Sequence, residues 1–114
     1  VQAHHHLSPH SMCEPSMKVL RPQTVVATSF YVRDIQPDKS KFGYLAALGA
    51  DLYCTSVGEP LLEQYPADYA YCGATSGHIV IRVAPGGDSY MVYTLDDTDK
   101  KYRVKKIDGP FKCK

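Results

Sequence analysis

The sequence predicts a small all-β protein, an antiparallel β-sandwich or barrel of five to seven short strands stapled by two disulfides, with little helix. Runs of β-branched and aromatic residues alternate with turns rich in glycine, proline and aspartate. The 114-residue chain also carries four cysteines, an even number that is typical of small disulfide-bonded domains. Neither an internal repeat nor a second core is evident, so we expect one β domain over residues 24–114.

The chain begins with a segment that has no regular pattern. Residues 1–23 are rich in histidine and proline and follow neither the helical nor the strand period, which predicts an irregular arm. The character changes at Thr24. Residues 24–33 are mostly β-branched or aromatic, with Val26, Thr28 and Phe30 on one face, and predict the first strand.

The middle of the chain predicts further strands around a polar loop. Residues 42–54 place Phe42, Tyr44, Ala46 and Leu48 on one alternation, which favours a strand, or two short strands broken near Gly49. Residues 55–71 form the polar loop, in which one short helical turn is expected.

The last third of the chain predicts hairpins. Pro85-Gly86-Gly87-Asp88 is a strong turn signal between two apolar runs, and aspartates mark the next turn. Strands are expected at residues 78–84, 89–95 and 102–107, with a short edge at 111–113.

The cysteines predict how this fold would be stapled. Cys54 and Cys72 bracket the polar loop, while Cys13 and Cys113 stand near opposite ends. Of the three connectivities, we favour Cys54–Cys72 with Cys13–Cys113, because the first closes a local loop and the second ties both termini to the core. Disulfides imply an oxidising compartment. Val1-Gln2-Ala3 resembles the end of a leader cleavage site, so we expect a secreted, extracellular protein.

Composition narrows the class of partner. Hydrophobic residues make up 44% of the chain and charged residues 22%, with a net charge of +1. This balance argues against bulk nucleic-acid binding, and no apolar run is long enough to span a bilayer. We therefore expect no membrane insertion and a monomer, with nucleic acid a less favoured partner.

Catalytic residues are not expected. Outside the arm the only histidine is His78, at a strand start, where a structural or exposed role is the usual one. The carboxylates of Asp96, Asp97 and Asp99 could suggest a glycosidase pair or a calcium loop, but they fall in one short turn and suit a solvated hairpin. The sequence predicts no enzymatic activity and no cofactor.

Histidines of the arm are candidate metal ligands. His4, His5, His6 and His10 could bind copper, nickel or zinc. A run of three histidines can also be left by a purification tag, and a flexible arm offers nothing to orient the rings. We expect no metal site.

Charge concentrates at the end of the chain. Seven of the thirteen basic residues lie in the last fifteen positions. Lysines on an edge strand can simply discourage aggregation. If Tyr102 and Val104 point inward, however, a basic surface for an acidic or polyanionic partner results. The residues predicted to bind that partner are Lys101, Arg103, Lys105 and Lys112.

The order of these segments resembles a known family. Thr28-Ser-Phe-Tyr-Val-Arg33, Asp51-Leu-Tyr-Cys54, Tyr69-Ala-Tyr-Cys72 and Gly77-His-Ile-Val-Ile-Arg-Val83 are similar to segments of the small secreted fungal proteins related to the Alternaria major allergen. That resemblance covers about residues 24–95. It implies a cysteine-stapled antiparallel β fold, a Cys54–Cys72 disulfide, and a role as an allergen, elicitor or effector at the plant surface. Near its end the chain has one cysteine where the family has a pair.

A second resemblance is to small fungal effectors built on a ribonuclease-like scaffold. Arg82 lies on a predicted strand, but Glu59 and Glu63 fall in the loop and no histidine follows His78, so such a scaffold would be catalytically inactive. The sequence thus favours a secreted, non-enzymatic fungal effector or elicitor that binds a host plant protein or a polyanionic surface. A ribonuclease-like protein and a carbohydrate- or metal-binding surface protein are the alternatives.

Overall fold

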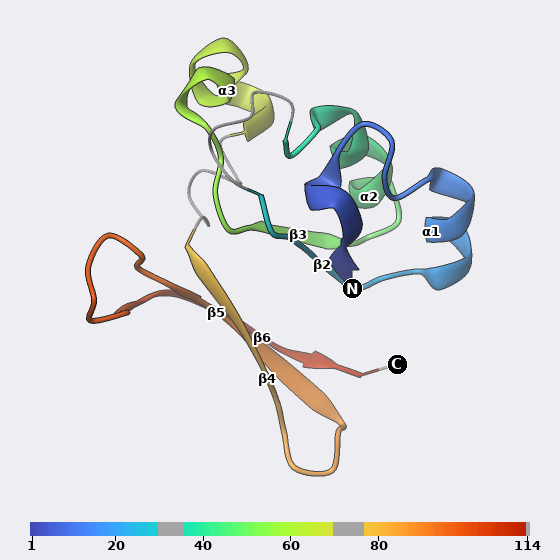
Figure 1. Ribbon diagram of the computed structural model, residues 1–114. Coiled ribbons are helices and arrows are strands. Elements are labelled where there is room, and N and C mark those ends of the chain that lie inside the picture. Colours follow the sequence, from blue (N-terminus) through green and yellow to red (C-terminus); the bar gives the residue numbers. More distant parts are fainter. Residues whose placement is uncertain (30–35, 70–76, 114) are drawn as a thin grey trace. The chain divides into compact units, whose positions relative to one another are not determined.

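The chain divides into two compact units, Val1–Ser76 and Gly77–Lys114. The computed structural model of the protein (Figure 1) describes all residues except 30–35, 70–76 and 114. Residues 1–23, expected as an irregular arm, contain a strand and helices. The single β domain predicted over residues 24–114 stays a prediction. None of the helices in the described parts is long and apolar enough to cross a membrane.

The first unit combines a small parallel sheet with short helices. Its strands pair in the order β1-β2-β3, with Gln2 beside Val26 and Val25 beside Leu52. Parallel neighbours need a crossover connection, and helical segments lie between the strands in sequence. The elements in chain order are β1 (Gln2–Ala3), η1 (His4–Leu7), α1 (Glu14–Leu20), β2 (Thr24–Ala27), η2 (Lys39–Lys41), α2 (Phe42–Ala47), β3 (Asp51–Cys54) and α3 (Glu59–Gln64).

One hydrophobic core holds these elements together. Leu45 from α2 packs in a buried cluster with Val25 from β2 and Leu52 from β3. Met17 from α1 and Met12, just before it, belong to the same cluster. Helices α1 and α2 thus each bury one side chain in this core, as expected for short amphipathic helices.

The second unit is a three-stranded antiparallel sheet in the order β4-β5-β6. Its strands are β4 (His78–Val83), β5 (Ser89–Leu95) and β6 (Val104–Lys112), which confirms the two predicted hairpins. The sequence predicted that this strand would end before a separate short edge at residues 111–113. In the structure β6 is continuous, and its pairing with β5 shifts register twice, between Tyr90 and Val92 and between Thr94 and Leu95. At Gly109 a side chain could not be accommodated, because φ is 115° and a Cβ would lie 3.0 Å from the Tyr90 carbonyl oxygen.

The predicted all-β class is wrong, because residues 42–47 form a helix and the first sheet is parallel. The predicted strand would have buried Tyr44 and Ala46 on one face. The structure buries Leu45 instead and leaves Ala46 exposed. Leucine and alanine are strong helix formers, so local propensity and the burial of Leu45 agree on α2. Helix α1 was likewise not expected, whereas α3 lies in the polar loop where one short helical turn was expected.

The predicted disulfide staples are also wrong. Among the described residues no disulfide is present, and Cys13 and Cys113 are exposed thiols. Cys13 begins α1, with its Sγ 2.9 Å from Ser16 Oγ. Cys54 is buried at the end of β3 inside the apolar core, and Cys72 lies outside the described residues. Core packing and strand pairing therefore hold the described fold.

Candidate functional site

Three of the four predicted partner-binding cations gather around one turn of the second unit. Arg103 forms a 2.6 Å ion pair with Asp99, whose other oxygen accepts from the Lys101 backbone N–H at 2.7 Å. Lys105 follows at the start of β6, and the Arg103 side chain is exposed. The turn is therefore a mixed-charge cluster rather than a purely basic one.

Asp96 stabilises the same turn. Hydrogen bonds from the Thr98 hydroxyl and backbone N–H hold the pKa of Asp96 below its usual value, and the charges of Lys105 and Arg103 act in the same direction. The Asp-Asp-Thr-Asp segment thus acts as a capped turn, in agreement with the solvated hairpin predicted for it.

Lys112 lies apart from the other three. It pairs with Ser89 at the far end of β6 from the Arg103 turn. A strand rises about 3.3 Å per residue, so the two ends of β6 are roughly 25 Å apart. The structure therefore brings Lys101, Arg103 and Lys105 together and separates them from Lys112. Their role in binding stays a prediction.

The strand register defines an apolar face between these two ends. Val80 lies opposite Tyr93, which lies opposite Ile107, so that the three side chains share one side of the sheet. Leu95 and Val104 form the next row on the same side. We call these five residues the apolar face; Val80, Val104 and Ile107 are 43%, 52% and 55% exposed.

Charged and aromatic side chains border the apolar face. By strand alternation the Arg82 side chain, on β4, lies on the same side of the sheet as the apolar face. Lys112 lies on that side too, at the same end of the sheet but on β6. At the other end the Tyr102 ring meets the His78 ring edge-on at 5.1 Å. The basic surface was predicted on the condition that Tyr102 and Val104 point inward, yet both are 52% exposed. The sequence signal for this apolar face was the presence of apolar residues on both sides of β4, and it was overlooked.

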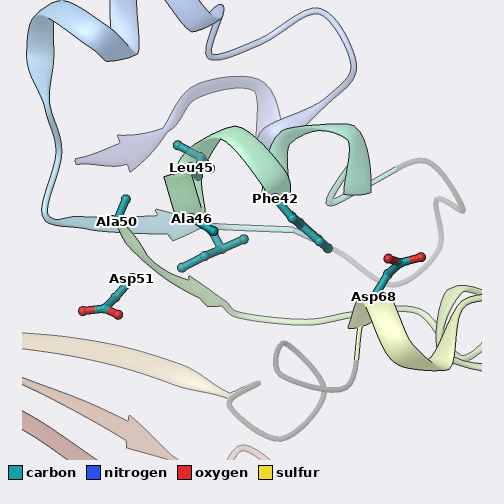
Figure 2. Close-up of a pocket in the computed structure, with 7 residues that line it drawn as sticks. Phe42, Leu45, Ala46, Ala50, Asp51 and Asp68 are labelled. Carbon is teal, nitrogen blue, oxygen red and sulfur yellow. The ribbon is translucent and has the colours of Figure 1, made fainter. Parts of the chain in front are cut away.

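A separate hollow of about 220 Å³ lies within the first unit (Figure 2). Phe42, Leu45 and Ala46 of α2 form its apolar wall, while Asp51 and Asp68 lie at its two ends. Lys39 neutralises Asp68 at 3.3 Å. Such a hollow could admit a small apolar group, but the residues lining it include no nucleophile with an adjacent base.

The described side chains of His5 and His6 contact other groups of the first unit. His6 Nδ1 donates to the Thr28 carbonyl, and His5 Nδ1 lies 3.1 Å from Ser8 Oγ. His5 and His6 line one open hollow with Gln2. Within the described residues no three histidine, cysteine or acidic side chains are grouped as metal ligands would be.

Cys13 is the thiol whose pKa is shifted. Hydrogen bonding to the Ser16 side chain and backbone lowers the pKa of Cys13, and the nearby positive charge of Lys41 adds to the effect. Cys13 is exposed, so its thiolate would be open to reagents. Cys13 is thus a reactive thiol on the described surface of the first unit.

Comparison of the chain with known protein families, curated proteins and solved structures found no match in any of the three. The resemblance to the Alternaria allergen-related proteins therefore stays a prediction from the sequence segments.

Proposed function

We propose that this chain is a non-enzymatic binding protein, and that its second unit presents the apolar face and its bordering cations to an acidic protein partner. The observation that carries the proposal is the exposure of Val80, Val104 and Ile107 on the same side of one sheet. Soluble proteins rarely leave a contiguous apolar patch exposed unless it binds something.

Charge indicates the kind of partner. The second unit carries eight basic and five acidic residues, a net charge of +3, whereas the first carries five basic and seven acidic, a net charge of −2. Arg82 and Lys112 border the apolar face and form no ion pair with another described residue. A partner with acidic groups around an apolar centre would complement this surface and would be steered toward it.

The biological setting of the proposal is a secreted fungal effector or elicitor that binds a host plant protein. This setting is supported by the resemblance to the allergen-related proteins alone. The cysteines give this setting no support, because Cys13 and Cys113 are free thiols. A polyanion such as a cell-wall polysaccharide would need only the charges and not the apolar centre.

The test compares variants as bait in leaf apoplastic fluid. Ile107→Asp should remove the binding of an acidic protein that the original chain retains, and Lys112→Glu should weaken it and reduce its salt dependence. Val19→Asp is the matched control, because Val19 is 83% exposed on α1 in the other unit. Heparin retention, measured on the same variants, tests the polyanion alternative.

Loss of the same bound protein in Ile107→Asp but not in Val19→Asp would support the proposal. Equal retention in both variants would refute it. Heparin retention that falls in Lys112→Glu and is unchanged in Ile107→Asp, with no protein bound specifically, would replace the acidic protein with a polyanion.

A further inference from the structure

The outer edge of β4 has no neighbouring strand among the described residues. In the order β4-β5-β6, β4 pairs with β5 alone. The N–H of Ala84 donates to Ser89 O at 2.9 Å, which fixes the alternation of the antiparallel ladder. The backbone groups of Val80 and Arg82 therefore point toward β5, and those of Ile79, Ile81 and Val83 point outward. Three N–H groups and three carbonyls line this edge.

The two edges of the sheet differ in how they are protected. β6 contains Pro110 and two register shifts, and carries exposed Lys105 and Lys112. Proline, lysine and bulges are the devices by which natural sheets avoid pairing at an edge. β4 has none of them, and Arg82 is its one permanently charged residue. The unprotected strand is therefore β4.

We propose that β4 pairs antiparallel with β4 of a second copy of this chain, with the two-fold axis passing through Ile81. Such an interface must be self-complementary. The three residues whose backbone groups point outward, Ile79, Ile81 and Val83, are all β-branched and apolar. Ile81 then faces Ile81 of the second copy, and Ile79 faces its Val83. Each of these pairs exchanges two backbone hydrogen bonds.

Neither the charged residues nor the backbone groups of β4 conflict with this register. Arg82 lies opposite Val80 of the second copy, so the two arginines do not oppose each other directly. A shift by one residue would set the outward backbone groups of Ile81 against the inward ones of Val80 or Arg82 and lose the hydrogen bonds; the register centred on Ile81 pairs all three outward residues. The paired strands join two three-stranded sheets into one continuous sheet.

The dimer is expected to be weak. Two six-residue strands bury less than the roughly 1,200–2,000 Å² typical of stable complexes. Self-association should therefore grow with protein concentration over the micromolar to millimolar range. This proposal revises the monomer expected from the sequence, and it rests on a strand edge rather than on the apolar face.

The first experiment is sedimentation equilibrium of two matched variants. Ile81→Lys places two like charges face to face at the two-fold axis and should weaken self-association by about tenfold or more. Ile107→Lys is the control, since Ile107 is similarly exposed but lies on β6. The original chain and the control should dimerise alike. A chain that is monomeric up to millimolar concentration, or equal weakening by both variants, would overturn the proposal.

The second experiment tests the register and does not depend on a lysine being tolerated. Antiparallel pairs that exchange hydrogen bonds place their Cα atoms about 5.5 Å apart, within disulfide range. Under mild oxidation Ile81→Cys should form an 81–81 crosslink, identified by peptide mass spectrometry. Ile79→Cys should form no 79–79 crosslink, because position 79 faces position 83. Equal crosslinking at both positions, or none at 81, would refute the two-fold arrangement.

Discussion

Thr94 offers a sharp test of how the second unit is stabilised. Its side chain is 1% exposed near the end of β5, between Ile79 on β4 and Lys106 on β6. The Thr94 Oγ1 finds no hydrogen-bond partner in the described part of the chain. A buried hydroxyl without a partner costs about 1–3 kcal/mol relative to an apolar group of the same shape.

Valine has nearly the shape of threonine and the same preference for strands. Thr94→Val should therefore raise the free energy of unfolding by about 1–2 kcal/mol, and the melting temperature by about 4–8 °C per kcal/mol. Thr94→Ser is the matched control. It retains the hydroxyl and loses a buried methyl, so it should lower the free energy of unfolding by about 1 kcal/mol.

The assay is urea unfolding followed by the NMR amide signals of β4, β5 and β6, which report on the second unit alone. Stabilisation by Thr94→Val with destabilisation by Thr94→Ser is the expected pair of results. A Thr94→Val variant less stable than the original chain would show that the hydroxyl makes a hydrogen bond, and the reasoning would fail.

Three further predictions concern other parts of the chain. Leu45→Ala should lower the stability of the first unit by about 2–5 kcal/mol in the same urea assay, since Leu45 is 1% exposed; a loss below 1 kcal/mol would contradict its core role. Ser16→Ala should raise the pKa of Cys13 and slow its alkylation near neutral pH; unchanged pH–rate profiles would refute the Ser16 contact. Thr98→Ala should raise the pKa of Asp96 measured by NMR. Because this pKa is lowered in the folded state, the associated stability is present above the ordinary value of 3.8 and is lost as pH falls through the lowered one; an unaltered titration would exclude the Thr98 hydroxyl hydrogen bond as a cause.

The second unit could be predicted from the sequence because its signals are local. Residues 78–95 contain two apolar runs around Pro85-Gly86-Gly87, and a hairpin needs only neighbouring residues to pair. The end of β6 was divided in the prediction at Gly109, since glycine and proline usually end a strand. In the structure the strand continues past Gly109 with a register shift.

The first unit was mispredicted because its segments are short and ambiguous. Residues 42–48 contain apolar residues at nearly every position, so an alternation and a helical stripe fit equally well. Which one forms is decided by Leu45 packing against Val25 and Leu52, contacts that lie far apart in sequence. The same holds for β1, whose pairing with β2 no local pattern near Gln2 indicates.

The candidate site was predicted only in part, for a related reason. Charge clustering near the C-terminus drew attention to the second unit, but sequence alone could not reveal that Asp99 binds Arg103 or that Lys112 lies at the other end of β6. The apolar face was missed because a three-stranded sheet was expected to bury one side against a second sheet. Exposure on both sides of β4 appears only in the structure.

The two proposed surfaces follow from one property of the second unit. Among its described residues, Val92 is the one apolar side chain that is fully buried, whereas Val80, Ile81, Val83, Val104 and Ile107 are all exposed. A three-stranded sheet with so small a core is marginally stable, because most of its apolar surface remains in water. Any molecule that covers the apolar face or extends β4 therefore stabilises the folded sheet as it binds. Binding and stability are thus coupled in this unit, and a variant such as Ile81→Lys should lower its stability at high protein concentration more than at low concentration.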